Sequence, residues 1–180
     1  MNLPAAPVSA AILGRSYDQM TGAQLSAAQA ELELAAATRL GQMLFEFARL
    51  DTSLGLCLVW SGEGRQVGVL TKQVADYSFH KKLVLLKDLV DEAFEHGSRE
   101  HSAYIEWLDD AHAMRTKRNQ LVHGRWGTDP RRNQVFNVIG LPTSLDQREV
   151  YYSIEDLQEQ LEQLTRLLTR LNELRFKLAV

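Results

Sequence analysis

Apolar residues recur at steps of three and four positions through a long segment, from about Ala23 to Trp60. This spacing places them on one face of an α-helix, and at 1.5 Å per residue the helix would be about 55 Å long. Glycines at 62 and 64 then interrupt the pattern. The predicted buried face consists of Leu25, Ala28, Leu32, Ala36, Leu40, Met43, Leu44, Phe47, Leu50, Leu54 and Leu58.

Three further segments predict helices, and each begins at a serine that can cap the first turn. They are residues 79–94 after Ser78, a segment from Ser98 or Ser102 to His123, and residues 154–177 after Ser153. Gly124 follows the helix that ends at His123, and we expect a left-handed C-terminal cap there. The last helix has a predicted buried stripe of Leu157, Leu161, Leu164, Leu168 and Leu171.

The remaining segments are shorter and less regular. Residues 65–76 fit either a short strand or a helical turn, and residues 125–152, with two short apolar runs, predict a β-hairpin or a folded loop. We therefore expect an all-α protein, a bundle of about four main helices with a hairpin or loop insertion before the last one. Residues 1–20, rich in Ala and Pro, predict a flexible arm, and residues 21–180 a single domain.

Several classes of protein are disfavoured by composition. Cys57 is the single cysteine, so neither a disulfide framework nor a multi-cysteine zinc site is expected. The longest apolar run, Leu54 to Trp60, is too short to span a membrane, and the N-terminus has no basic region typical of a secretory signal. We expect a cytoplasmic protein without a cofactor. His96 and His101 lack the helical spacing of metal ligands and are expected to be surface residues without a metal.

The charge of the chain is unevenly distributed. The whole chain has a net charge of −3, but residues 115–132 carry six basic side chains and one acidic side chain, a local net charge of +5. Basic clusters attract phosphate groups. The basic residues are Arg115, Lys117, Arg118, Arg125, Arg131 and Arg132.

Arg118, Asn119 and His123 lie within this basic segment at the end of a predicted helix. Cleavage of RNA without a metal requires a base, an acid and cationic groups that stabilise the charged transition state. Histidine transfers protons near neutral pH, and arginine matches the geometry of phosphate oxygens. Because five residues of helix turn through about 500°, Arg118 and His123 point about 140° apart, whereas Asn119 and His123 share a face.

Arg118 falls on the apolar stripe of its helix, where an unpaired charge is costly. Glu46 and Asp51 are candidate partners by charge. Trp126 is a candidate base-stacking residue, although packing over the end of the bundle is the favoured explanation.

This pattern resembles the R-x4–6-H signature of the HEPN superfamily of small helical-bundle proteins, in which Asn, Asp or His usually follows the arginine. The resemblance implies a HEPN-like bundle and a metal-independent endoribonuclease that acts as a homodimer, with two motifs facing across a cleft. Such proteins occur in toxin–antitoxin and defence systems, so a cognate antitoxin or partner protein is also implied. The toxins paired with minimal nucleotidyltransferases often carry Tyr two residues after the histidine, where this chain has Arg125.

We therefore predict that Arg118 contacts the scissile phosphate, that His123 transfers a proton and that Asn119 orients either group. RNA would bind through Arg115, Lys117, Arg125, Trp126, Arg131 and Arg132. One alternative is a non-catalytic HEPN-like module that binds a nucleotide, RNA or a partner protein through the same surface. Another is a dimeric scaffold in which Arg118 is ion-paired and His123 is structural.

Overall fold

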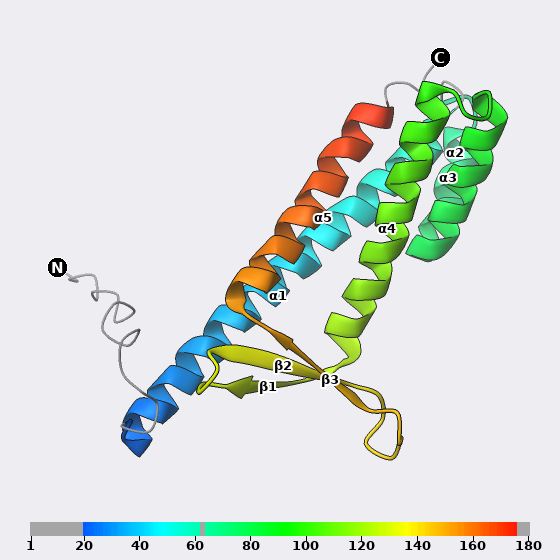
Figure 1. The fold of residues 1–180 in the computed structure, drawn as a ribbon. Coiled ribbons are helices and arrows are strands. Elements are labelled where there is room, and N and C mark those ends of the chain that lie inside the picture. The colour runs from blue at the N-terminus through cyan, green and yellow to red at the C-terminus, as the bar shows by residue number, and fades with distance from the viewer. Residues whose placement is uncertain (1–19, 62–63, 176–180) are drawn as a thin grey trace.

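The computed structural model describes residues 20–61 and 64–175. The predicted arm, apart from Met20, and the predicted end of the last helix at Lys177 lie outside the described residues. The described part of the chain is mostly helical, as predicted, with five helices and one small antiparallel sheet (Figure 1). In chain order the elements are α1 (Gly22–Val59), α2 (Val67–Ala75), α3 (Phe79–Ala93), α4 (Arg99–His123), β1 (Arg125–Asp129), β2 (Gln134–Ile139), β3 (Arg148–Tyr152) and α5 (Ile154–Arg175).

Capping serines and a threonine mark where the helices begin. Ser78, Ser98 and Ser153 each accept a hydrogen bond from a backbone N–H of the first turn, as predicted. Thr21 and Gln24 form a reciprocal capping box at the start of α1. The predicted long helix is thus confirmed, and in Figure 1 it runs beside α5 in the bundle and extends past it to the sheet.

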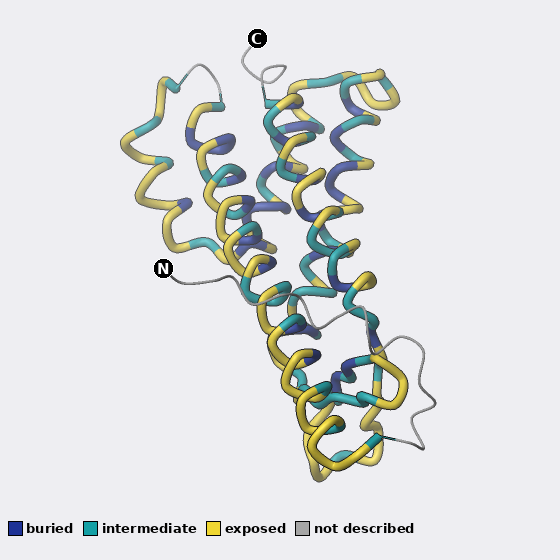
Figure 2. The backbone as a smooth tube through the Cα atoms, turned by 90° about the vertical axis from the view of Figure 1, so that its left-hand side faces the viewer, coloured by how far each residue is buried: buried dark blue, intermediate teal, exposed yellow. Residues whose placement is uncertain are grey.

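The core lies between the helices of the bundle, on the inward faces that Figure 2 shows in dark blue. Trp107 and Tyr104 of α4 are fully buried, and each donates a hydrogen bond to a backbone carbonyl of α5, to Leu167 at 2.9 Å and to Leu174 at 2.6 Å. Because α4 and α1 both cover α5, its buried surface is wider than one stripe. Leu167 and Leu174 are therefore buried, whereas Leu161 and Leu168 are only half-buried.

Cys57 lies in this core. Burial raises the pKa of its thiol to about 11, so the side chain is protonated at neutral pH. A protonated thiol is a poor nucleophile, so Cys57 acts as a packing residue of the core.

The two irregular segments are more ordered than the sequence indicated. Residues 67–75 form a helix, α2, of which only Val74 is buried. The insertion is a three-stranded sheet of order β1-β2-β3, not a simple hairpin. Its last two strands coincide with the predicted apolar runs, but β1 was missed because Trp126 is its only large apolar residue.

The predicted left-handed cap at Gly124 is wrong. Its φ of −82° and ψ of 166° are extended, so the chain passes directly from α4 into β1. Glycine is required there instead because the side chain of Asn137 lies close to its Cα atom. A Cβ atom on Gly124 would lie 1.5 Å from Oδ1 of Asn137, a fully buried residue of β2.

Candidate functional site

The end of α4 is held by the sheet that follows it. The carbonyl of Gln120 accepts hydrogen bonds from Gly124 N at 3.1 Å and from Asn137 Nδ2 at 2.9 Å. The carbonyl of Leu121 accepts one from Trp126 Nε1, also at 2.9 Å. Groups of the sheet and its junction thus satisfy carbonyls that a helix terminus leaves without intrahelical partners. This arrangement fixes the last turn of α4, which carries His123.

His123 is exposed, and its ring has no polar partner among the described residues. Asn119, also exposed, lies one turn earlier, and its Oδ1 accepts a hydrogen bond from Arg118. Because Asn137 and Trp126 satisfy the nearby carbonyls, neither Asn119 nor His123 is needed to cap the helix. The imidazole of His123 is therefore available to solvent.

Arg118 lies half-buried against α1. Its Cζ is 5.1 Å from the ring centroid of Phe47, and its Nη1 donates to Asn119 Oδ1 at 3.1 Å. Its Nε is buried and has no hydrogen-bond partner among the described residues. The guanidinium group thus contacts both the ring of Phe47 and the exposed side-chain amide of Asn119.

Neither suggested acidic partner pairs with Arg118. Glu46 forms an ion pair with Arg49, one turn further along α1. Asp51 pairs with Lys82 of α3 at 2.8 Å, and the Lys82 side chain is only 9% exposed. Both acids therefore form ion pairs with other residues, and the predicted pairing of Arg118 with either of them is wrong.

A cavity of about 160 Å³ lies beside Arg118, between α1, α4 and α5. One of its lining residues, Leu44, was expected on a buried face but is 47% exposed, and Val122, which also lines it, is 42% exposed. The cavity is otherwise lined by Leu40, Met43, Met114, Leu121 and Leu164. The guanidinium group therefore adjoins an apolar surface that is open to solvent.

The other basic residues fall into two groups. On α4, Arg115 has a buried Nε without a partner among the described residues, and Lys117 lies 5.5 Å from the Tyr152 ring centroid. Lys117 also lines a cavity of about 410 Å³ between α4 and α5, together with Arg166 and Arg170. Lys117 therefore lies on the face of α4 that adjoins α5, next to two basic side chains of α5.

The second group lies on the sheet. Arg125 donates to Gln147 Oε1 at 2.5 Å, and Arg131 is exposed in the turn after β1. Arg132 lies 5.3 Å from the Tyr151 ring centroid and forms an ion pair with Asp129 at 3.6 Å. These three residues thus lie on the sheet or in its turns, and Arg125 and Arg132 are already engaged by other side chains.

Trp126 is half-buried in β1. Its ring centroid lies 5.7 Å from that of Tyr152, and its indole N–H is used in the bond to α4. It also lines a cavity of about 350 Å³ with α1 residues, including Ala36 and Leu40. Its contacts in the structure are those of a packing residue that joins the sheet to α1 and α4.

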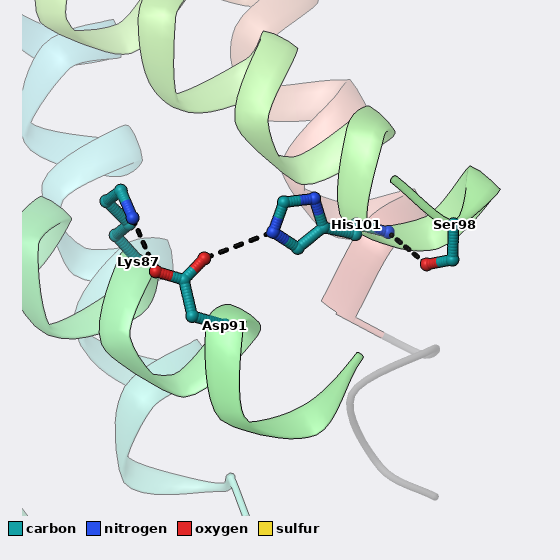
Figure 3. A network of polar contacts seen from close by, with 4 residues as sticks. All are labelled: Lys87, Asp91, Ser98 and His101. Atoms are coloured by element: carbon teal, nitrogen blue, oxygen red, sulfur yellow. Dashed lines mark hydrogen bonds and ion pairs between the residues drawn. The ribbon is translucent and has the colours of Figure 1, made fainter. Parts of the chain in front are cut away.

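A third cluster, not expected from the sequence, lies at the other end of α4. His101 is 9% exposed, not a surface residue, and its Nε2 lies 3.1 Å from Asp91 Oδ1 (Figure 3). A ligand atom of His96 lies within 4.8 Å of ligand atoms of both. Hydrogen bonds, first from Lys87 and then from His101, lower the pKa of Asp91. The available signal was the regular spacing of Asp91, His96 and His101 at five-residue steps.

His112 and His80 form a separate pair, with ring centroids 5.6 Å apart. Burial lowers the pKa of His112, and the positive charge of Arg115 lowers it further. His112 is thus favoured in its neutral form.

Comparison of the chain with protein-family models, curated proteins and solved structures found no significant match. Among the described helices, none combines the length and the apolar character needed to cross a membrane.

Proposed function

We propose that this protein is a metal-independent endoribonuclease of the HEPN type that acts as a homodimer. The observation that carries the proposal is the state of His123, an exposed imidazole that no described residue engages, at a rigidly held helix end. Arg118, five residues earlier, has no acidic partner within residues 20–61 and 64–175, and its buried Nε is unsatisfied there. Side chains with a purely structural role are normally satisfied when buried.

The chemistry of RNA cleavage matches these groups. The imidazole of His123 removes the proton of a ribose 2′-hydroxyl, whose oxygen attacks the adjacent phosphorus. The bond from phosphorus to the 5′-oxygen breaks, and that oxygen accepts a proton from an acid. Arg118 stabilises the negative charge on the phosphate oxygens, and Asn119 orients its guanidinium group. The products are a 2′,3′-cyclic phosphate and a 5′-hydroxyl.

One protomer supplies one such imidazole, whereas the reaction uses a base and an acid. A twofold dimer would supply the second from the same residue of the other protomer. Leu44 and Val122, exposed beside Arg118, support self-association at this surface because exposed apolar side chains favour burial at interfaces.

The test is cleavage of RNA in the presence of EDTA by the wild type, His123→Ala and Arg118→Ala. We expect activity in EDTA. The loss should be about 10²–10⁴-fold in His123→Ala, as is typical of general acid–base groups, and about 10²–10³-fold in Arg118→Ala, as is typical of electrostatic stabilisers. His80→Gln, which changes a histidine of α3, is the matched control and should retain activity. Abolition of cleavage by EDTA, or full activity of His123→Ala, contradicts this mechanism.

The alternative is a non-catalytic module that binds RNA, a nucleotide or a partner protein, such as an antitoxin, through the same surface. It is supported by the basic residues on α4, Arg115 and Lys117, next to Arg118. It predicts RNA that stays intact and binding that weakens in Arg118→Ala. Affinity that does not change between about 50 and 200 mM salt excludes phosphate recognition.

A further inference from the structure

We propose that Asp91, His96 and His101 bind one divalent transition-metal ion of the zinc type. Each residue offers one ligand atom, and these atoms all lie within 4.8 Å of one another. The closest pair, Asp91 Oδ1 and His101 Nε2, is 3.1 Å apart. For metal–ligand bonds of about 2.0–2.1 Å in a tetrahedral site, ligand atoms lie about 3.3 Å apart, so this pair already has the required spacing.

The turn between α3 and α4 brings the three residues together. Asp91 lies in the last turn of α3 and His101 in the first turn of α4. Gly97, with a φ of +80°, reverses the chain between the two histidines, and their ring centroids are 4.7 Å apart. Ser98 Oγ accepts a hydrogen bond from His101 N at 3.2 Å and so caps α4 (Figure 3).

Two of the ligand side chains are held before any ion binds. The His101 side chain is 11% exposed, and Asp91 is fixed by contacts to both of its carboxylate oxygens. Lys87 Nζ donates to Oδ2, whereas Oδ1 faces His101 (Figure 3). A metal ion can therefore bind Oδ1 while Lys87 remains on Oδ2, where it orients the carboxylate as outer-shell groups commonly do.

The chemistry of the ligands selects the class of ion. Two imidazoles and one carboxylate suit zinc and neighbouring first-row ions, whereas magnesium and calcium prefer oxygen ligands. His96 is exposed, so the side of the site that it forms is accessible to an entering ion. Three protein ligands leave a fourth position for water.

This site goes beyond the proposed ribonuclease function and is separate from it. His101 and His123 are 22 residues apart on α4, which at 1.5 Å per residue is about 33 Å. The ion would instead join the end of α3 to the start of α4.

The experiment is calorimetric titration of zinc into the EDTA-treated and dialysed full chain, with cobalt absorption as a second readout of coordination. We expect one ion per chain in the wild type and affinity at least about tenfold lower in His96→Ala and Asp91→Asn. Saturating zinc should raise the Tm of the wild type by about 5 °C or more and leave that of His96→Ala nearly unchanged. His80→Gln and Asp88→Asn are the matched controls and should bind zinc as the wild type does.

His96 is exposed, so His96→Ala should fold, and circular dichroism verifies this for every variant. Absence of zinc binding to the wild type, or equal affinity in His96→Ala, overturns the proposal. RNA cleavage by His96→Ala is measured in parallel. A chain that binds zinc but cleaves no RNA contradicts the ribonuclease proposal alone, and a nuclease that binds no zinc contradicts this inference alone.

Discussion

Replacement of Arg118 by methionine should raise the stability of the fold and abolish RNA cleavage. Arg118 lies against the Phe47 ring and lines an apolar cavity, and its buried Nε has no hydrogen-bond partner among the described residues. A residue retained for stability would not be expected to leave a buried donor unsatisfied. Arg118→Met keeps an unbranched, flexible side chain, although a shorter one, and removes the charge and the polar atoms.

The magnitude follows from the contacts that change. Removal of the buried, unsatisfied Nε–H relieves a cost of about 1–3 kcal/mol. Against this, the contact of the guanidinium group with Phe47 is worth about 0.5–1 kcal/mol, and the exposed bond to Asn119 about 0.5–1 kcal/mol. Methionine adapts to irregular apolar surroundings. Taken at the middle of each range, the free energy of unfolding should therefore rise by about 0.5 kcal/mol, which corresponds to an increase in Tm of about 1–2 °C.

The assay is urea denaturation followed by circular dichroism, together with RNA cleavage by the same preparation. We expect a higher midpoint with an unchanged slope and activity reduced by about 10²-fold or more. Arg49→Met, at an exposed arginine of α1, is the control and should change stability by less than about 0.5 kcal/mol.

Opposite changes in stability and activity are expected where a functional residue is held in an unfavourable environment. If Arg118→Met instead lowers the free energy of unfolding by more than about 1 kcal/mol, the arginine contributes to the scaffold. The reasoning from its unsatisfied Nε is then refuted.

Other substitutions test the fold and its dependence on pH. Gly124→Ala places a Cβ atom 1.5 Å from Asn137 Oδ1 and should lower the free energy of unfolding in urea by about 2–4 kcal/mol, because Asn137 must leave its bond to the end of α4. Gly41→Ala lies within α1, where the added Cβ meets no neighbouring side chain within 4 Å. This substitution should instead raise the free energy of unfolding by about 0.5–1 kcal/mol. Equal effects in the two variants would contradict the assignment of the Gly124 contact. Because burial lowers the pKa of His112 from 6.5, the unfolded chain binds more protons, and stability decreases as the pH falls below that value. Urea titrations at about pH 7 and about pH 5 should therefore show a smaller loss of stability in His112→Gln than in the wild type, and an identical loss in the two proteins would contradict this.

Local sequence signals predicted the helical part of the fold well. The starts of α3, α4 and α5 follow from Ser78, Ser98 and Ser153, whose side chains act within one turn of their own positions. The long periodic run likewise predicted α1. The motif at Arg118 and His123 was also placed correctly at the end of a helix, because spacing along one helix depends only on helix geometry.

The sequence signals did not predict the interactions between segments that are distant in the chain. The conformation of Gly124 depends on Asn137, thirteen residues further along the chain, and β1 exists because β2 supplies its hydrogen bonds. Arg118 lies on Phe47 because α1 and α4 pack together, although the charge pattern alone suggested an acidic partner.

The sequence by itself determined the four long helices, the serine caps at the starts of three of them and the residues near each helix end, because these depend on contacts within a few positions. Only the tertiary structure decided which side chains are engaged and which are free. It paired Asp51 with Lys82, left the ring of His123 exposed and brought Asp91 to His101. The physical reason is that burial and pairing are set by the packing of whole elements, which no local spacing specifies.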